Sequence, residues 1–216
     1  MVGAACAAHP GPPIIPVPAG DPPPYPPPQE DPVPVQHSAS YPADPDRVLA
    51  VLTDESFLRE YAAGLGTTVE DVATTRDGDT VRTTARLRAS TAGVPSVFTR
   101  FLGGQVTVLD TRTWRPDGAG GHRGELTVST SVMGREAALR GQTVLTASGG
   151  STLSTTTAEA TVDAPLVGRQ AEAAVRELAQ IVLRRESESV LRRLGPDGGS
   201  DGGPDGGPDA GPVDGG

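Results

Sequence analysis

Proline and glycine are concentrated at the two ends of this chain, which limits where a folded core can form. Thirteen of the 22 prolines lie in residues 1–34, and ten of the 28 glycines lie in residues 195–216. Segments so poor in apolar side chains cannot offset the entropy lost on ordering, so both ends are expected to be disordered tails. Residues 35–194 have a common single-domain length. We therefore predict one domain between two tails.

The net charge of −9 comes from the tails and not from the predicted domain. Eight of the 27 acidic residues lie in the tails, whereas all 18 arginines lie between Arg47 and Arg193. The domain therefore has 19 acidic residues and 18 arginines, a net charge of −1. A nearly neutral domain gives no electrostatic basis for binding nucleic acid or an anionic membrane.

Several features bear on the compartment. The only cysteine is Cys6, so an internal disulfide is impossible. No apolar run approaches the roughly 18 residues of a membrane span. Residues 1–9 lack the basic start and long apolar run of a signal peptide. A cytoplasmic location is therefore expected.

The first tail contains the proline-rich segment 22–28, which is typical of polyproline II structure. One interpretation is a ligand for a proline-recognising module, with Tyr25 as an anchor. The other is a flexible extension. We prefer the extension, because composition alone supports no more than a statement about composition.

The predicted domain begins with a strand and two helices. A strand is predicted over residues 35–41. Asp44 and Pro45 then predict a helix start, because aspartate caps helices and proline is favoured at the first helical position. A second helix is predicted over residues 54–63, where apolar residues keep helical spacing.

From Thr67 onward the apolar period changes to two, which predicts antiparallel strands. In residues 81–88, small or apolar side chains alternate with threonine and arginine. These arginines could bind an anionic group, but the alternation favours a solvated outer face. Glycine-rich turn signals separate further strands, so a meander is expected. Those strands are predicted over residues 105–114, 123–131, 137–147 and 152–162.

The last of these strands contains a change of phase. Leu153 and Thr155 share one parity, whereas Ala158 and Ala160 share the other. If both pairs face the core, an extra residue must lie between them. We therefore predict a β-bulge or sharp bend within residues 155–157.

A long final helix is predicted over residues 166–194, ended by Gly195 and Pro196. Apolar residues recur every three or four positions and predict a stripe that faces the core. The stripe consists of Val167, Ala171, Ala174, Val175, Leu178 and Val182. The order of elements suits an α+β fold in which a curved sheet wraps around one helix.

Five short motifs in the domain occur in an order found in a known family. They are Tyr41-Pro42-Ala43-Asp44-Pro45, Val51-Leu52-Thr53-Asp54, Phe98-Thr99-Arg100-Phe101-Leu102-Gly103-Gly104, Thr113-Trp114-Arg115-Pro116 and Pro165-Leu166-Val167-Gly168. On these motifs, residues 35–194 resemble the actinobacterial family called domain of unknown function 2505, in the START-like (SRPBCC) superfamily.

This resemblance implies a helix-grip START-like fold. In that fold a curved antiparallel sheet wraps around a long C-terminal helix, two short helices follow the first strand, and a cavity lies between sheet and helix. The resemblance implies no activity, because the family is uncharacterised. Superfamily relatives include lipid carriers, hormone receptors and polyketide cyclases or aromatases, but a fold alone does not transfer function.

Catalytic and metal-binding groups are scarce. The three histidines, His9, His37 and His122, are too few and too dispersed for a zinc, iron or Ser-His-Asp site. The glycine turn 118–124 does not fit a dinucleotide fingerprint, because a strand follows it. No metal or cofactor is expected.

The carboxylates of the strands are mostly expected at the surface. We expect Asp110 and Glu125 to pair with arginines such as Arg112 and Arg123 on exposed faces, because such ions are rarely buried. Glu159 is the exception, since the predicted bulge nearby would decide whether it points into the cavity. An inward carboxylate could perform acid–base chemistry.

The segment 94–102 is the most informative one for ligand binding. Phe98, Phe101 and Leu102 stand at i, i+3 and i+4, flanked by glycines that permit hinge motion. They predict a short helix over the mouth of the cavity, although the same spacing is typical of core packing. Trp114 likewise suits either a cavity wall or a core plug.

The leading hypothesis is a non-enzymatic domain that binds a hydrophobic small molecule or lipid between the sheet and the long helix. The candidate ligand-binding residues are Phe98, Phe101, Leu102, Trp114, Leu178, Val182 and Glu159. One alternative is a cyclase- or aromatase-like enzyme that uses Glu159 in the cavity. The other is a ligand-free structural or interaction module, since small strand residues could fill the interior. No protein partner is indicated.

Overall fold

The computed structural model describes residues 34–92, 104–132, 135–163 and 168–195. The described helices and strands belong to one compact unit, Pro32–Gly216. The two predicted tails lie almost entirely outside the described ranges. Their disorder, and with it the predicted domain limits, stays a prediction.

The elements follow the predicted order. They are β1 (Val35–Tyr41), α1 (Pro45–Leu52), α2 (Glu55–Gly64), β2 (Thr68–Asp77), β3 (Thr80–Ser90), β4 (Gln105–Pro116), β5 (His122–Val132), β6 (Arg135–Ser148), β7 (Ser151–Val162) and α4 (Gly168–Leu194). The strands form one antiparallel sheet in the order β1-β7-β6-β5-β4-β3-β2.

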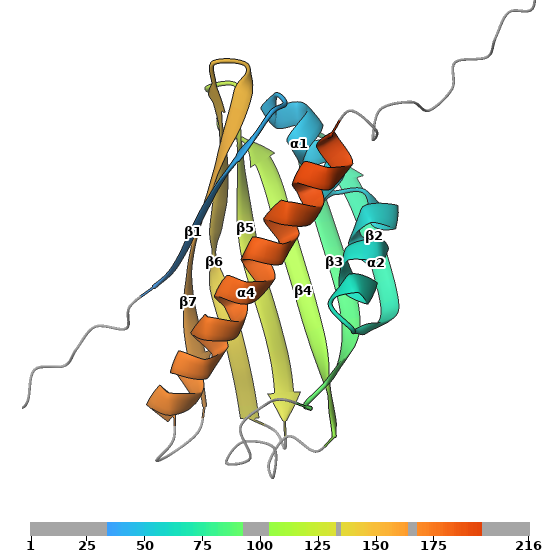
Figure 1. Ribbon diagram of the computed structural model, residues 1–216, viewed down its shortest axis with the longest axis vertical. Helices are drawn as coiled ribbons and strands as arrows, with labels where there is room; N and C mark the ends of the chain where they lie inside the picture. The colour runs from blue at the N-terminus through green and yellow to red at the C-terminus, as the bar shows by residue number, and fades with distance from the viewer. Residues whose placement is uncertain (1–33, 93–103, 133–134, 164–167, 196–216) are drawn as a thin grey trace, which may run out of the picture. The chain divides into compact units, whose positions relative to one another are not determined.

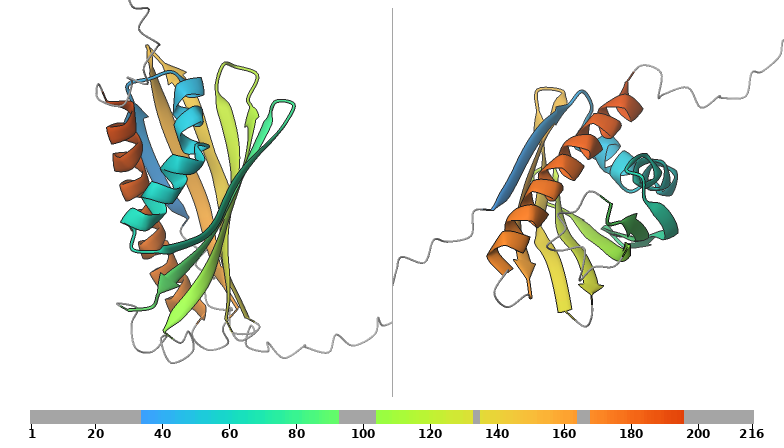
Figure 2. Two further views of the ribbon diagram at one scale, coloured as in Figure 1. Left: turned by 90° about the vertical axis from the view of Figure 1, so that its right-hand side faces the viewer. Right: turned by 60° about the horizontal axis from the view of Figure 1, so that its bottom comes forward.

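The sheet curves around the long helix. Helix α4 crosses one face of the sheet, and α1 and α2 lie on that same face (Figure 1). Seen from the side, the strands bend toward the helices (Figure 2). We call the face toward the helices the inner face. This α+β arrangement confirms the predicted helix-grip fold.

Both short helices begin at the predicted aspartates. The Asp44 carboxylate accepts a hydrogen bond from the backbone N–H of Arg47 at 2.8 Å. Asp54 accepts one from the backbone N–H of Phe57 at 2.7 Å. Each carboxylate thus satisfies a backbone donor that the first turn of a helix leaves unpaired.

We predict that the Asp54 cap contributes to stability in a pH-dependent way. A hydrogen bond from Ser56 is the largest influence that lowers the pKa of Asp54, and the N–H of Phe57 and the charge of Arg193 add to it. Because the folded-state pKa lies below the ordinary value of 3.8, the stabilisation is present above that value. It is lost as the pH falls through the folded-state pKa.

The substitution Asp54→Ala should therefore lower the free energy of unfolding by about 1 kcal/mol at pH 7. Urea unfolding at pH 7 and at acidic pH measures this difference, which should shrink on acidification. Asp54→Asn is the matched control, because asparagine also caps helices and should retain most of the stability. Equal stability of Asp54→Ala and the unsubstituted protein at pH 7 would contradict the prediction.

Strand β7 alternates regularly, so the predicted bulge within residues 155–157 is wrong. Every second residue from Thr152 to Ala160 is buried, and Leu153 is exposed. Pairing with β1 and β6 continues without a register shift. A shift does occur in β2, between Val69 and Asp71.

The reason lies in hydrogen bonds that satisfy polar side chains inside the sheet. The Thr152 hydroxyl donates to the carbonyl of Ala43 at 2.7 Å, and Thr156 shares a hydrogen bond with Thr143 at 2.9 Å. A hydroxyl with a partner can be buried at little cost. The apolar pattern, which counted Leu153 as inward, could not anticipate those partners.

The stripe of α4 that faces the sheet also differs from the predicted one. Leu178 is 58% exposed and Val182 is only partly buried, so the predicted stripe is wrong at Leu178. The buried residues are Ala171, Ala179, Leu183, Glu186, Ser187, Val190 and Leu194. Two faces of this helix carry apolar residues, and the face that is buried includes a glutamate and a serine. Apolar spacing alone therefore favoured the wrong face.

The described residues form two hydrophobic clusters in the core. One surrounds Trp114, which is 1% exposed, and joins α1, α2 and the C-terminal part of α4 to the sheet. The other joins β1, β5, β6 and β7 to the middle of α4 through Ala179 and Leu183. Trp114 is therefore packed in the core, the second of its two predicted interpretations.

Candidate functional site

Strand β4 carries charged side chains on its inner face. Side chains of a strand alternate between its two faces, so Asp110 and Arg112 point to the same side as the buried Trp114. Among the arginines that the structure describes, Arg112 is the one that is buried. The long helix faces this part of β4 with Glu186, which is also buried.

These three residues form a cluster of ion pairs, here called the inner triad (Asp110, Arg112 and Glu186). The Nε and Nη2 atoms of Arg112 donate to the two oxygens of Asp110, at 3.4 Å and 3.2 Å. Its Nη1 donates to Oε1 of Glu186 at 2.5 Å. All three guanidinium nitrogens are thus engaged by carboxylates, and the triad carries one more negative than positive charge.

Burial and charge act in opposite directions on Arg112. Burial alone lowers the pKa of Arg112, but the neighbouring carboxylates of Asp110 and Glu186 outweigh it and hold that pKa above its ordinary value. The guanidinium therefore remains charged inside the protein. An ion pair of this kind is costly to break, because the remaining charge would be left without a partner.

The structure corrects the expectation for Asp110 and agrees with the expected exposure of Glu125. Asp110 does pair with Arg112, but the pair lies on the inner face and not on the exposed face that was expected. Glu125 is exposed as expected, and its partner at 3.4 Å is Arg115. Arg123 instead donates to Gln142 at 2.6 Å.

Two tyrosines lie close to the triad, the buried Tyr41 and the partly buried Tyr61. The hydroxyl of Tyr61, on α2, donates to the carbonyl of Val182 at 2.9 Å. Burial raises the pKa of Tyr61, and the nearby Glu186 carboxylate raises it further. Burial likewise raises the pKa of Tyr41, whereas its hydrogen bond with Ser187 lowers it. Both phenols therefore remain protonated and act as hydrogen-bonding groups.

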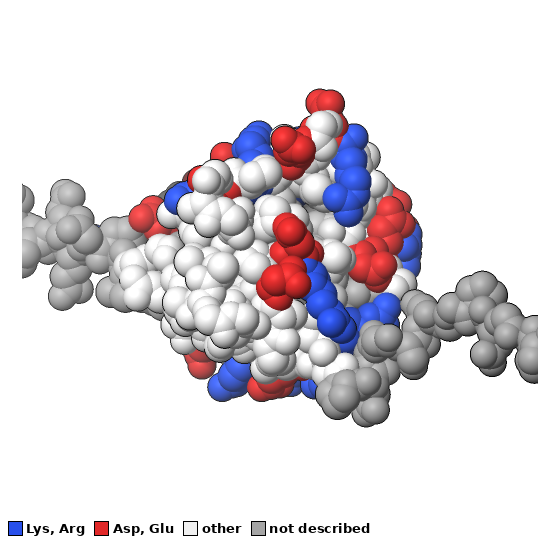
Figure 3. All heavy atoms as spheres, turned by 90° about the horizontal axis from the view of Figure 1, so that it is seen from above, with Lys and Arg blue, Asp and Glu red and all other residues white. Residues whose placement is uncertain are grey.

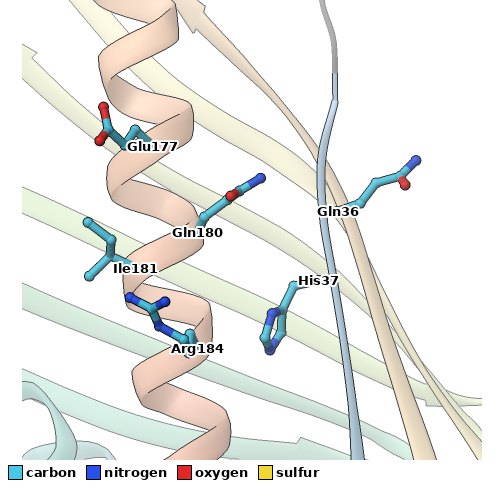
Figure 4. A pocket seen from close by; sticks show the side chains of 6 residues that line it. All are labelled: Gln36, His37, Glu177, Gln180, Ile181 and Arg184. Atoms are coloured by element: carbon cyan, nitrogen blue, oxygen red, sulfur yellow. The ribbon is translucent and has the colours of Figure 1, made fainter.

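A polar pocket of about 380 Å³ opens between strand β1 and helix α4. Its lining residues are Gln36, His37, Glu177, Gln180, Ile181 and Arg184. His37 points from β1 toward the helix and Gln180 points back toward β1, whereas Gln36 points away (Figure 4). Nε2 of His37 lies 2.7 Å from Oγ of Ser187, so the pocket borders the polar residues of the interior.

Apolar side chains on the inner face of β3 and β4 are only partly covered. We call them the inner strip (Leu87, Ala89, Val106 and Val108). Leu87 lies opposite Val108 in the sheet, and Ala89 opposite Val106. All four are partly buried and, among the described residues, belong to neither hydrophobic cluster. Val81 and Trp114, at the other end of the same strands, are fully packed.

The predicted ligand-binding residues are not brought together among the described residues. Phe98, Phe101 and Leu102 lie outside the described residues. Glu159 is exposed on the outer face, opposite Arg140 of β6, so it does not point inward as the hypothesis required. Its orientation follows from the regular alternation of β7.

Sequence reasoning missed the triad and His37 as interior groups. The signal for Asp110 and Arg112 was their shared parity with Trp114. The signal for Glu186 was its position between Leu183 and Val190 on one helical stripe. Both signals were outweighed by the general rule that charged residues are rarely buried.

Other kinds of site find little support in the described part of the chain. No group of three or more histidine, cysteine or acidic side chains is placed there to hold a metal ion. None of the described helices is long and apolar enough to cross a membrane. Seen from the end near α1, basic and acidic side chains are interspersed beside a broad area that carries neither (Figure 3).

An open antiparallel sheet wrapped around a long C-terminal helix defines a START-like helix-grip protein. The chain belongs to the family described as protein of unknown function DUF2505, whose sequence profile matches residues 36–194. This confirms the resemblance seen in the short motifs. No curated protein matches the chain.

Solved structures agree on the fold. TTHA0849 from Thermus thermophilus is 20% identical, with a TM-score of 0.51 over 75% of this chain and 97% of its own. A conserved protein from Geobacillus kaustophilus is 15% identical, with a TM-score of 0.51 over 75% and 95%. At these identities the likeness concerns the fold and not the ligand.

Proposed function

We propose that this domain binds a hydrophobic small molecule or lipid between the sheet and α4, without catalysing a reaction. The observation that carries the proposal is the inner strip. Its apolar side chains face the interior, yet they are only partly buried. In a filled core such side chains would be covered, and a partly covered apolar surface inside a concave face is typical of a ligand site.

The segment between Ser90 and Gln105 bears on the same proposal. These two residues are partners in the sheet, next to the pair Ala89 and Val106 of the inner strip. Both ends of the segment are therefore attached beside that strip. Phe98, Phe101 and Leu102 belong to this segment, and we propose that they contribute apolar contacts to the ligand. Their role is a prediction from the sequence.

The two alternatives have less support. The enzyme hypothesis relied on Glu159, which is exposed on the outer face. Among the described residues, Asp110 and Glu186 are carboxylates on the inner side of the sheet, and both are held by Arg112. A ligand-free module with a filled interior is disfavoured by the partial exposure of the inner strip, although the end around Trp114 is densely packed.

We expect Val108→Trp to weaken binding of the neutral fluorescent probe N-phenyl-1-naphthylamine by about tenfold or more, which corresponds to about 1.4 kcal/mol. The larger side chain would occupy space above the inner strip. Thr107→Trp is the matched control, because Thr107 is the next residue on β4 and is exposed on the outer face. Fluorescence titration gives the dissociation constants, and circular dichroism checks that both variants fold.

Two results would contradict the proposed function. One is that the unsubstituted protein neither binds the probe nor retains any hydrophobic molecule after gentle purification, as judged by native mass spectrometry. The other is that Val108→Trp and Thr107→Trp bind the probe equally well, since binding would then occur away from the inner face.

A further inference from the structure

The inner triad lies directly beside the inner strip. Asp110 follows Val108 by two positions on the same face of β4, a separation of about 7 Å along a strand. Across the sheet, Ala85 lies opposite Asp110 and Leu87 lies opposite Val108. A molecule whose apolar part covers the inner strip would therefore place its next atoms near Asp110.

Asp110 is also the most accessible member of the triad. Its side chain is 23% exposed, compared with 11% for Arg112 and 8% for Glu186. A ligand would thus meet the carboxylate of Asp110 before it met the guanidinium. A carboxylate accepts hydrogen bonds and attracts cations, and it repels another anion.

Arg112 is poorly placed to attract an anionic ligand. Its Nε and Nη2 donate to Asp110 and its Nη1 donates to Glu186, so all three nitrogens already have anionic partners. Arg185, which also influences Tyr61 electrostatically, is exposed. The triad itself contains two carboxylates and one guanidinium, so the local balance is negative.

From this juxtaposition we propose that the domain selects hydrophobic ligands whose polar end is an amine or another hydrogen-bond donor, and that it disfavours ligands that end in a carboxylate. This inference rests on the proposed function, because it concerns the ligand of the same site. The apolar part would lie on the inner strip and the donor would contact Asp110. Charge selection follows because a second anion beside Asp110 and Glu186 is repelled in a poorly solvated interior.

The test compares three ligands with the same twelve-carbon chain, namely dodecylamine, 1-dodecanol and dodecanoic acid. At pH 7 the amine is protonated and the acid is ionised. Each displaces N-phenyl-1-naphthylamine from the folded full-length chain, below its critical micelle concentration. We expect the amine to bind about tenfold or more tightly than the acid, with the alcohol between them.

A pair of variants locates the selection. Asp110→Asn keeps the shape of the side chain but removes its charge, so the ratio between amine and acid should fall by about tenfold. Glu159→Gln makes the same change of charge on the exposed outer face and should leave the ratio unchanged. Thermal unfolding of both variants checks that the domain remains folded.

The outcomes separate this inference from the proposed function. If the neutral probe and all three ligands fail to bind, the proposed function is overturned and the inference falls with it. If 1-dodecanol binds but the acid binds the unsubstituted protein as tightly as the amine, the inference alone is overturned. The inference alone is also overturned if Glu159→Gln changes the ratio as much as Asp110→Asn. The comparison on the unsubstituted protein decides the matter even if Asp110→Asn does not fold.

Discussion

The substitution Arg112→Met should lower the free energy of unfolding by about 3–5 kcal/mol. It would leave the carboxylates of Asp110 and Glu186 in the interior without their shared cation. The two uncompensated charges would then repel each other, and the carboxylate of the buried Glu186 would be poorly solvated. Urea unfolding followed by circular dichroism at pH 7 measures the loss.

Two further variants make this prediction specific. Arg115→Met is the matched control, since Arg115 pairs with Glu125 on an exposed face of the same strand and should cost at most about 1 kcal/mol. The triple variant Asp110→Asn, Arg112→Met, Glu186→Gln should recover much of the lost stability, because it removes the whole set of charges. Equal losses for Arg112→Met and Arg115→Met would show that burial of the triad has no energetic consequence.

The substitution Trp114→Ala should be comparably destabilising, by about 3–5 kcal/mol. Trp114 is almost fully buried and packs in the cluster that holds α1, α2 and the end of α4 on the sheet. Truncation would remove this contact and leave a cavity that rigid strands cannot close. The same urea titration measures the effect, and a loss below that of Arg115→Met would contradict it.

Gly124 allows a sharper test of how Trp114 is packed. A Cβ atom at position 124 would lie 2.6–2.8 Å from atoms of the Trp114 ring, too close for an undistorted contact. Gly124→Ala should therefore cost about 1–3 kcal/mol by overpacking. The cost should fall in the Trp114→Ala background, so the two substitutions should be coupled.

A second glycine provides the control for this coupling. None of the described residues comes within 4 Å of a Cβ atom built at Gly104, which precedes β4. Gly104→Ala should change stability by less than about 0.5 kcal/mol and should be additive with Trp114→Ala. If Gly124→Ala costs the same with and without the tryptophan ring, the expected contact is absent.

Much of the fold was predictable because its signals are local. Asp44 caps the helix that it was expected to cap, since capping depends on residues three positions away. The second helix starts beside Asp54, where its apolar spacing predicted the start, although the capping role of Asp54 was not predicted. The strict alternation of residues 81–88 indicated which face of β3 is inward. The apolar side chains predicted one face as buried, and the arginines predicted the opposite face as exposed. The order of these elements was enough to predict a sheet that grips the last helix.

The candidate site was less predictable because it depends on contacts between distant residues. Glu186 can be buried because it meets Arg112, 74 residues earlier in the chain. Ser187 likewise forms a hydrogen bond with His37, 150 residues away in the chain. Neither residue's own neighbours in the sequence reveal these partners, so a local pattern counts both as surface residues.

The amino-acid sequence by itself determined the succession of strands and helices, the cap of the first helix and the family, because each is specified by periodicity or by short motifs. Only the tertiary structure decided which face of α4 meets the sheet, which parity of β7 is inward, and that a triad of charges lies inside. In each of these cases the apolar pattern did not single out the inner side chains, because the stability of the folded state depended on whether a polar side chain found a partner on another element. Such partners exist only once the chain has folded.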